Sequence, residues 1–468
     1  MKRIAIIGGG ISGLSAAFAL EKERSQGTQL EYVIFEASDR VGGVIRTERI
    51  DDCLLEAGPD SFLTEKPWAA DLCRELGLGD QLIGSNDAAR KTYMLIKGRL
   101  LPIPDGLMFM IPTRLAPTFF SPLFSWPTKV RILREWFCRP RQDDTDVTVA
   151  EFVERHYGRE MVERVADPLL SGVYGGSADE LSVQSVLPRF VQMEASHGSL
   201  GKAMVAMRKR GGPRTAPLFT SLKNGMQQMV DALLARVPVS AQRINTPVET
   251  VKPESGKWLV VASRRTEEFD AVVISTPAYV ASAMLGKTDP GLDLGAIRYS
   301  SSVTAVLAYD QKVRAALPPG FGFLVPRTEN RRILAATFVH NKFPHRAPED
   351  RALIRCFLGG TRDDAILQVP DSEIQSLVRR ELEEILGIHA DPLFVRIHKW
   401  NSSMAQYNVG HSARIARVRE ILARTPGLAL AGNAYSGIGV PDCVRSGSEA
   451  AEKILGDLAI SFRAHTAK

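Results

Sequence analysis

Near its start the sequence reads Arg3-Ile-Ala-Ile-Ile-Gly8-Gly9-Gly10-Ile11-Ser12-Gly13, and Glu31-Tyr-Val-Ile-Phe-Glu36 follows. Residues 3–8 form an apolar run that ends in glycine, which is typical of a buried parallel strand. Residues 12–23 carry helix formers with apolar side chains at helical spacing, and residues 31–36 form a second apolar run. A strand, a helix and a strand within about 36 residues make one βαβ unit. This unit predicts a Rossmann-like α/β domain.

Gly8, Gly10 and Gly13 have the spacing G-x-G-x-x-G, directly after the strand and at the start of the helix. The first glycine permits a sharp turn, the second lets a pyrophosphate approach the backbone, and the third lets helix and strand pack closely. The helix N-terminus then offers free N–H groups to phosphates. Because glycines are common in turns, this pattern alone is weak evidence for a nucleotide site.

Glu36 ends the second strand, at the position where a carboxylate accepts hydrogen bonds from ribose hydroxyls. This carboxylate would repel a 2′-phosphate, so the sequence disfavours NADP and leaves NAD and FAD open. The alternative is a surface glutamate at a strand end without a ligand, which the joint match of spacing and residue type disfavours.

The segment Ala37-Ser-Asp-Arg40-Val-Gly42-Gly43-Val44-Ile-Arg46 favours FAD. Paired glycines after an arginine allow a second close backbone approach to a long cofactor, and Arg46 would place a fixed cation near its phosphates or its flavin ring. This run resembles the signature of amine-oxidase-like flavoproteins, in which a GG segment follows the Rossmann glutamate. The alternative is a glycine-rich hairpin turn with two solvated arginines.

Near the C-terminus, Ala431-Gly432-Asn433-Ala-Tyr-Ser-Gly437-Ile438-Gly439-Val440-Pro441 predicts a strand, a turn and a helix, since proline suits the first helical position. If this helix points at a flavin ring, its dipole favours the anionic reduced ring by about 0.3–2 kcal/mol. Taken alone, the pattern fits an ordinary strand–turn–helix better.

The composition excludes several classes of protein. The 468 residues, 44% hydrophobic and 24% charged, are typical of a globular chain of about three domains of roughly 150 residues. A net charge of +6 favours acidic ligands but is too dispersed for nucleic acid. The five cysteines show neither a disulfide framework nor a zinc pattern, so we expect a reducing cytoplasm and no metal site.

Two apolar stretches raise the question of whether the chain interacts with a membrane. Residues 2–20 resemble a signal peptide superficially, but three consecutive glycines make a poor apolar helix. Residues 106–127 are apolar, yet four prolines and Arg114 exclude a spanning helix. Two interpretations of residues 106–127 are equally supported: a buried loop with short helices, or an apolar surface that rests on a membrane or lines the entry to an apolar binding site. We therefore expect a cytoplasmic protein, with peripheral membrane contact under the second interpretation.

The order of elements predicts an α/β fold with α+β insertions, in which the FAD-binding domain is of the amine-oxidase/glutathione-reductase-like type. Residues 302–309, 321–326, 333–339 and 352–358 alternate as the strands of a largely antiparallel sheet do. Three predicted parts follow. They are a discontinuous FAD-binding domain (1–60, 220–290 and 405–468), a substrate-binding domain with a mixed or antiparallel sheet (61–90, 185–219 and 291–404), and a helical, membrane-associating part (91–184).

Four further runs are Glu56-Ala-Gly58-Pro59-Asp60-Ser61-Phe62, Pro168-Leu-Leu-Ser-Gly172-Val-Tyr174-Gly175-Gly176, Trp400 with Gln406-Tyr407-x-x-Gly410-His411, and Gly437–Pro441. With the earlier motifs they resemble the protoporphyrinogen/coproporphyrinogen oxidase family, in its soluble Gram-positive bacterial type, over essentially the whole chain. The resemblance implies an enzyme of haem biosynthesis that uses FAD and dioxygen to aromatise a porphyrinogen and releases hydrogen peroxide. It favours coproporphyrinogen III as substrate, with protoporphyrinogen IX as the alternative, and downstream haem-pathway enzymes as further partners.

By this resemblance, non-covalent FAD lies against Val248 at its adenine and Trp400 at its isoalloxazine, although both side chains fit simple core packing as well. Substrate contacts fall on Tyr174 and Gly175. The full set of implied cofactor contacts is Gly8, Gly9, Gly10, Ile11, Ser12, Gly13, Glu36, Ala37, Arg40, Gly43, Val44, Gly58, Pro59, Asp60, Ser61, Val248, Trp400, Ile438, Gly439 and Val440.

The catalytic side chain is unknown, since flavin N5 would accept the hydride and the cofactor supplies the redox chemistry. His411 is expected to be a structural hydrogen bonder rather than a base. Residues 167–176 and 321–339 are candidate apolar walls. The cations Arg208, Lys209, Arg210 and Arg214 form either a solvated turn or, as the minority hypothesis, a clamp for propionates.

Two other functions use the same N-terminal motifs. An amine oxidase or carotenoid desaturase would share them, but would not account for the runs at 167–176 and 400–411. A flavin-containing binding or membrane-associated assembly protein without turnover is the third hypothesis, and bound FAD without peroxide release from any porphyrinogen would favour it.

Overall fold

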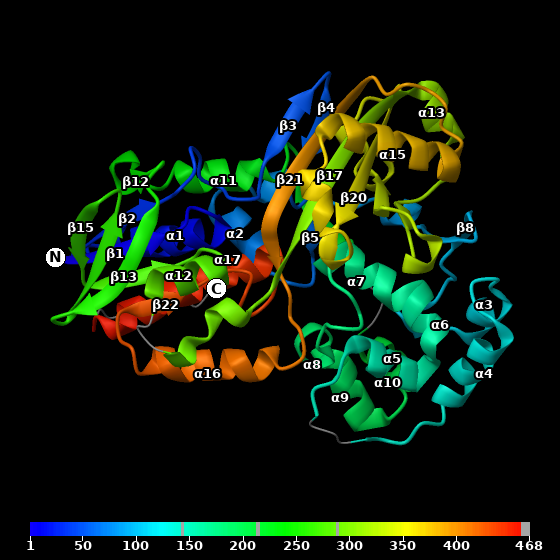
Figure 1. Ribbon diagram of the computed structural model, residues 1–468, viewed down its shortest axis with the longest axis horizontal. Helices are drawn as coiled ribbons and strands as arrows, with labels where there is room; N and C mark the ends of the chain where they lie inside the picture. Colours follow the sequence, from blue (N-terminus) through cyan, green and yellow to red (C-terminus); the bar gives the residue numbers. More distant parts are fainter. Residues whose placement is uncertain (142–144, 212–215, 287–289, 460–468) are drawn as a thin grey trace.

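The computed structural model describes residues 1–141, 145–211, 216–286 and 290–459. Figure 1 shows three parts: a parallel sheet flanked by helices, an antiparallel sheet with a long helix against it, and a group of helices from the middle of the sequence. The predicted α/β fold with α+β insertions is confirmed.

The parallel sheet combines strands from distant parts of the chain, in the order β12-β2-β1-β16-β22. Ile6 of the central strand β1 lies in register with Ile34 of β2 on one side and with Val273 of β16 on the other. The strands are β1 (Lys2–Ile7), β2 (Leu30–Phe35), β12 (Gln242–Arg243), β16 (Ala271–Ile274) and β22 (Leu428–Leu430).

Alternate residues of β1 face opposite sides of this sheet, as the pleat requires. Ile6 packs among the helices α1 (Ile11–Ser25), α11 (Gln227–Leu234) and α17 (Val440–Asp457). Ile7 packs on the other side, where the meander β13 (Val248–Glu254), β14 (Lys257–Ala262) and β15 (Arg265–Phe269) and the helices α12 (Ala278–Leu285) and α16 (His411–Ala423) lie. The helices α1 and α17 come from opposite ends of the chain and lie side by side, because a Cβ at Gly447 would stand only 2.1 Å from the Ser12 carbonyl oxygen.

The second sheet has the order β21-β17-β20-β19-β18-β7-β8 and is antiparallel except between β18 and β7. Val303 and Leu307 of β17 pack on one face together with Ile374 and Val378 of helix α15 (Asp371–Leu386). The strands are β7 (Thr92–Ile96), β8 (Arg99–Pro102), β17 (Tyr299–Asp310), β18 (Gly322–Leu324), β19 (Ile333–Phe338), β20 (Arg351–Gly359) and β21 (Phe394–Ala405).

The hairpin β7–β8 lies within residues 91–184, for which the sequence predicted helices. Tyr93 pairs with Phe323 of β18, and the alternating residues Tyr93 and Met94 face two different hydrophobic cores. The pairing partner lies more than two hundred residues further along the chain, so no local sequence pattern indicates that residues 92–96 form a strand.

The helical part comprises α3 (Leu115–Phe120), α4 (Trp126–Glu135), α5 (Val149–Tyr157), α7 (Asp167–Tyr174), α9 (Pro188–His197) and α10 (Leu200–Gly211). Helix α5 begins at a capping box, in which Thr148 and Glu151 satisfy each other's backbone N–H groups. Phe190 of α9 and Leu200 of α10 share the core of α5, although residues 185–219 were expected in the substrate-binding domain. Among the described residues, no helix has the length and apolar character needed to cross a membrane.

Candidate functional site

The turn between β1 and α1 offers the space and the donors that a diphosphate needs. The residue before α1 is Gly10, which supplies no side-chain cap, so the N–H groups of the first turn require another acceptor. A Cβ at Gly13 would stand 2.0 Å from the Gly8 carbonyl oxygen, whereas a Cβ at Gly10 would meet no protein atom within 4 Å. Helix and strand therefore touch at Gly13, and the backbone at Gly10 faces open space.

Glu36 lies at the end of β2, next to the segment that leads into β13 and Val248. The Glu36 carboxylate is half-buried and accepts hydrogen bonds from the N–H groups of Gly9 at 2.7 Å and Ser38 at 2.9 Å. The Ser38 hydroxyl donates at 2.8 Å to the same oxygen as the Ser38 N–H. Among the described residues, the other oxygen has Gly9 as its one partner, so it retains acceptor capacity for a ribose hydroxyl. The N–H of Thr246 donates to the Glu36 carbonyl at 2.8 Å, which brings the start of β13 and Val248 to this corner.

The loop that contains Gly42 and Gly43, the paired-glycine loop, packs against the turn between β1 and α1, the phosphate turn. A Cβ at Gly43 would lie 3.3 Å from the Gly10 Cα. Arg40 donates to the carbonyl oxygens of Gly43 and Ile45, both at 2.8 Å, so it shapes this loop. Arg46 was expected to be a cation near the cofactor; it is half-exposed and forms an ion pair of 2.9 Å with Glu48. Its charge is therefore largely compensated within the protein.

The segment after β4 (Cys53–Glu56) passes beside this loop, because a Cβ at Gly58 would stand 1.8 Å from the Val44 carbonyl oxygen. Trp400 of β21 donates its indole N–H to the Ala57 carbonyl at 2.9 Å, which places Trp400 at the same segment. Val44 is 42% exposed although it is apolar. An exposed apolar side chain in the loop that packs against the turn at Gly10 fits a ring system that covers it.

The C-terminal turn is held by Tyr407. Its hydroxyl accepts from the N–H of Gly437 at 2.8 Å and donates to the carbonyl of Asn433 at 2.7 Å. Helix α17 starts directly after Gly439, and the Asp442 carboxylate accepts from the Gly439 N–H at 3.2 Å. The predicted strand, turn and helix are thus present, with the helix N-terminus fixed at the site.

His411 supports this turn by stacking rather than by hydrogen bonding. Its ring lies parallel to that of Tyr407, with the centroids 4.0 Å apart. Neither ring nitrogen has a hydrogen-bond partner among the described residues. Burial lowers the pKa of His411 to about 4, so the ring is neutral at physiological pH. His411 was expected to be a structural hydrogen bonder, but its ring supports Tyr407 by stacking instead.

Tyr174 and Gly175, the candidate substrate residues, lie next to Tyr407. The ring centroids of Tyr174 and Tyr407 are 6.4 Å apart, and the Gln406 amide donates to the Tyr174 carbonyl at 2.8 Å. Burial raises the pKa of Tyr174 to about 12, and the nearby Asp442 carboxylate adds to this shift. The end of α7 thus joins the glycine turn before α17.

The two predicted apolar walls lie in contact with each other. A Cβ at Gly172 of α7 would lie 3.3 Å from the side chain of Leu324 in β18. In contrast, Arg208 and Lys209 are exposed at the end of α10, in the helical part. The Arg210 side chain and Arg214 lie outside the described residues, so the propionate-clamp hypothesis gains no support.

Sequence reasoning missed three buried cations, Lys342, Arg346 and Arg355, which surround the segment after Glu56. Arg355 interrupts the apolar run Ala352-Leu-Ile-Arg-Cys-Phe-Leu358 of β20. A charge inside a buried strand must be paired, so Arg355 in this apolar run was the one sequence feature that could have indicated a buried charged cluster.

Removing the Tyr407 hydroxyl should loosen the turn before α17. In a Tyr407→Phe variant, the Gly437 N–H and the Asn433 carbonyl both lose their partner, so we expect the free energy of unfolding to fall by about 1–3 kcal/mol. FAD affinity, measured by quenching of flavin fluorescence, should fall several-fold. A Tyr32→Phe variant loses one hydrogen bond to Glu21 and serves as the control, with unchanged FAD affinity. Equal affinities of the two variants would contradict this role.

Comparisons with known proteins identify the family of the chain. Residues 11–455 match the family model described as flavin containing amine oxidoreductase. The chain is 34% identical to a coproporphyrinogen III oxidase of Bacillus subtilis (strain 168), over 97% of this chain and 98% of that protein. It is 33% identical to a coproporphyrinogen III oxidase of Staphylococcus aureus, over 98% of this chain and 100% of that protein.

A solved structure from Exiguobacterium sp. 255-15, assigned as a protoporphyrinogen oxidase, is 32% identical and covers 98% of this chain and 99% of its own, with a TM-score of 0.88. The open space at Gly10, the uncapped helix N-terminus and Glu36 fit the flavin nucleotide that the family name requires. The chain therefore belongs to the flavin-containing amine oxidoreductases, within the protoporphyrinogen/coproporphyrinogen oxidase family that its motifs resemble, and it is an oxidoreductase with FAD as its cofactor.

Proposed function

We propose that this chain oxidises coproporphyrinogen III to coproporphyrin III, with FAD as the hydride acceptor and dioxygen as the final oxidant. The similarity to coproporphyrinogen III oxidases along nearly the whole chain carries this proposal. FAD, when bound, supplies the two-electron redox chemistry. Aromatising the macrocycle removes six hydrogens, so three rounds consume three molecules of dioxygen and release three of hydrogen peroxide.

In this proposal the protein binds and orients its ligands. The turn at Gly10 and the Glu36 carboxylate would hold the diphosphate and ribose, and the loops around Val44 and Gly58 would lie against the ring system. Tyr174 and Leu324 line the substrate side. The N-terminus of α17 carries a partial positive charge, part of which the Asp442 carboxylate in its first turn offsets. The remainder would favour negative charge on a bound flavin ring.

The test is an aerobic assay of the purified chain with each porphyrinogen, followed by porphyrin fluorescence and by peroxide formation. We expect coproporphyrinogen III to be oxidised faster than protoporphyrinogen IX and faster than in the enzyme-free control. Protoporphyrinogen IX is the second candidate, favoured by the assignment of the Exiguobacterium protein. If neither substrate reacts faster than the control, the proposed function is wrong.

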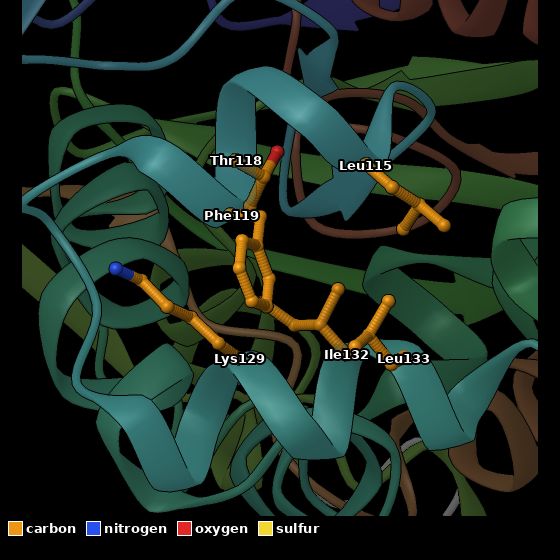
Figure 2. Close-up of a pocket in the computed structure, with 6 residues that line it drawn as sticks. All are labelled: Leu115, Thr118, Phe119, Lys129, Ile132 and Leu133. Carbon is orange, nitrogen blue, oxygen red and sulfur yellow. The ribbon is translucent and has the colours of Figure 1, made fainter.

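We further propose that the outer surface of α3 and α4 contacts anionic membranes. Ile111 and Leu123 are fully buried, so part of the apolar stretch 106–127 belongs to the core. Phe120 and Trp126, however, are 81% and 66% exposed, and Phe119 lines a shallow pocket between the two helices together with Lys129 (Figure 2). The Lys129 ammonium lies 5.2 Å from the Trp126 ring centroid, so a cation accompanies the exposed aromatics.

Serine at Phe120 and Trp126 should abolish this contact. We expect the wild-type chain to sediment with vesicles that contain phosphatidylserine, and the double variant Phe120→Ser/Trp126→Ser to remain in the supernatant. The Val239→Ser variant is the control, because Val239 is also exposed but belongs to the FAD-binding side. Equal sedimentation of the double variant and the wild type would overturn the membrane proposal without affecting the oxidase.

A further inference from the structure

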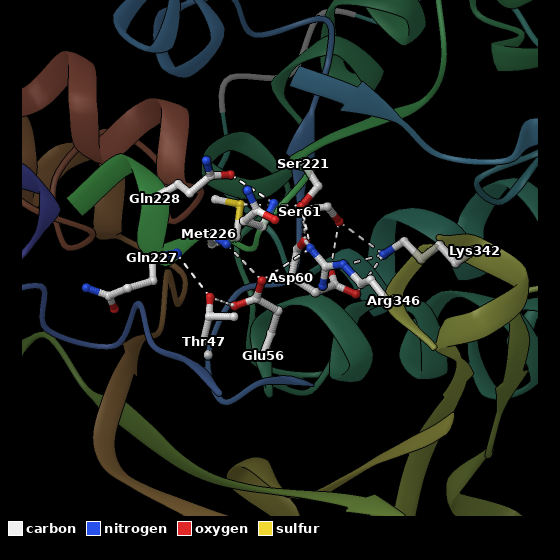
Figure 3. Close-up of polar contacts among 12 residues, drawn as sticks. Thr47, Glu56, Asp60, Ser61, Ser221, Met226, Gln227, Gln228, Lys342 and Arg346 are labelled. Atoms are coloured by element: carbon white, nitrogen blue, oxygen red, sulfur yellow. Dashed lines mark hydrogen bonds and ion pairs between the residues drawn. The ribbon is translucent and has the colours of Figure 1, made fainter. Parts of the chain in front are cut away.

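Five charged side chains converge at the segment Ala57–Ser61, and Figure 3 shows four of them: Glu56, Asp60, Lys342 and Arg346. The fifth, Arg355, lies in the middle of β20 and is almost completely buried. Lys342 and Arg346 come from the adjacent short helices α14 (Val339–Lys342) and η8 (Pro344–Arg346). Taking an ion out of water costs several kcal/mol, so the three buried cations require strong compensating contacts.

Their contacts are concentrated on the segment 57–61. Arg355 donates to the carbonyl oxygens of Ala57, at 3.3 Å, and Gly58. Arg346 donates to the carbonyl oxygen of Asp60 at 3.0 Å. Lys342 contacts both Asp60 carboxylate oxygens at 3.1 Å and the Ser61 hydroxyl at 3.0 Å. Three cations from two other segments of the chain therefore fix this one loop.

Glu56 anchors the start of the same loop. Its carboxylate accepts from the Thr47 hydroxyl and from the Met226 N–H, both at 2.8 Å, and lies 3.2 Å from the Arg346 guanidinium. Burial raises the pKa of Glu56 to about 7, while Arg346 opposes that shift. Burial also acts to raise the pKa of Asp60, but Lys342 and the two arginines outweigh it and hold this pKa below its ordinary range.

The cluster carries a surplus positive charge. With both carboxyl groups ionised, three cations face two anions, and protonation of Glu56 enlarges the surplus. The adjoining cavity has a volume of about 10 Å³ and is lined by Glu56, Asp60, Arg346 and Arg355. Because so small a space holds about one water at most, bulk solvent screens these charges poorly.

The segment 57–61 also borders the candidate flavin site. Gly58 packs on the carbonyl of Val44, and the Ala57 carbonyl that Arg355 contacts also accepts from the Trp400 indole. Any shift of this segment would therefore displace Trp400 and the paired-glycine loop together. The buried cations and the cofactor are linked through the same few backbone atoms.

We propose that Arg355, Arg346 and Lys342 position the Ala57–Ser61 segment against the flavin and that their surplus charge favours the reduced, anionic cofactor. They are positioning residues, since they act through the loop. The proposal rests on the flavin-binding part of the proposed function and is independent of which porphyrinogen reacts.

The test replaces Arg355 with methionine, which keeps an unbranched, flexible side chain but removes the guanidinium and with it the charge and both carbonyl contacts. We expect the apoprotein to bind oxidised FAD at least tenfold more weakly, measured by flavin fluorescence quenching. Reduced flavin should lose about another tenfold, which for a two-electron couple corresponds to a midpoint potential lower by about 30 mV. An Arg355→Lys variant keeps the charge, so it should restore the potential and only part of the affinity.

Arg314→Met is the matched control, because Arg314 also donates to two carbonyl oxygens, those of Pro348 at 2.8 Å and Arg351 at 2.6 Å, away from the loop. This variant should keep wild-type FAD affinity and potential. If Arg355→Met folds and keeps both wild-type values, the proposal is wrong. If it does not fold, Arg355→Lys decides, and wild-type affinity in that variant overturns the proposal. Failure to oxidise porphyrinogens, with the flavin shifts present, would contradict only the proposed substrate.

Discussion

A Gly13→Ala variant should fail to retain FAD and lose more than about 3 kcal/mol of folding free energy. The new Cβ would stand 2.0 Å from the Gly8 carbonyl oxygen, and neither β1 nor α1 can retreat, because both are buried in the same core. Overpacking ordinarily costs 1–3 kcal/mol, and contact with a fixed backbone atom places this case at or above the upper end. Thermal unfolding and the FAD content of the purified protein measure the two effects.

Gly10→Ala is the matched control that separates the cofactor from the fold. Its Cβ would meet no protein atom within 4 Å, and the backbone at Gly10 has a φ of −72°, which alanine adopts readily. We therefore expect unchanged thermal stability of the apoprotein, but FAD binding at least tenfold weaker, because the methyl group fills space next to the phosphate turn. Normal FAD content in Gly10→Ala would show that the diphosphate lies elsewhere.

Arg346→Met should be the most destabilising change among the buried charges. Arg346 is 1% exposed, and its removal leaves the Glu56 carboxylate and the Asp60 carbonyl without this partner. Breaking a buried ion pair from one side costs about 3–5 kcal/mol, because the remaining charge stays uncompensated. Urea unfolding followed by tryptophan fluorescence measures the loss.

The control for this change is Arg414→Met, which removes a half-exposed ion pair with Asp293 at 3.2 Å. Such pairs contribute about 0–1 kcal/mol, so the unfolding midpoint of this variant should lie near that of the wild type. Similar midpoints for the Arg346 and Arg414 variants would mean that the interior charges are screened and that the cluster does not hold the loop.

Local patterns predicted the parts of the fold that depend on local chemistry. The apolar run before Gly8 and the alternation in residues 302–309 gave the correct strands, since burial on one or two faces dictates those patterns. The hairpin β7–β8 was missed, because its apolar residues 92–96 suit a helix or a strand, and only pairing with β18 selects between them. Pairing across more than two hundred residues is a property of the assembled fold.

The residues of the candidate site likewise fall into those that a local sequence pattern predicted and those that it did not. The glycine turn and Glu36 are adjacent in sequence, so their spacing predicted a nucleotide site. The supports of that site come from far along the chain: Tyr407 holds the C-terminal turn, and Arg346 and Arg355 hold the loop after Glu56. A sequence pattern contains the residue types of such supports but not their distances, so these roles emerge only when the sheets are assembled.

Flavin reduction in the absence of oxygen tests most directly the claim that this chain binds FAD and oxidises a porphyrinogen with it, since the reaction requires both the bound FAD and the substrate. The purified chain, loaded with FAD, is mixed anaerobically with coproporphyrinogen III while the visible flavin absorbance is recorded. We expect the absorbance to bleach as porphyrin fluorescence rises, and to return when air is admitted. A flavin that stays oxidised with both coproporphyrinogen III and protoporphyrinogen IX would contradict the account.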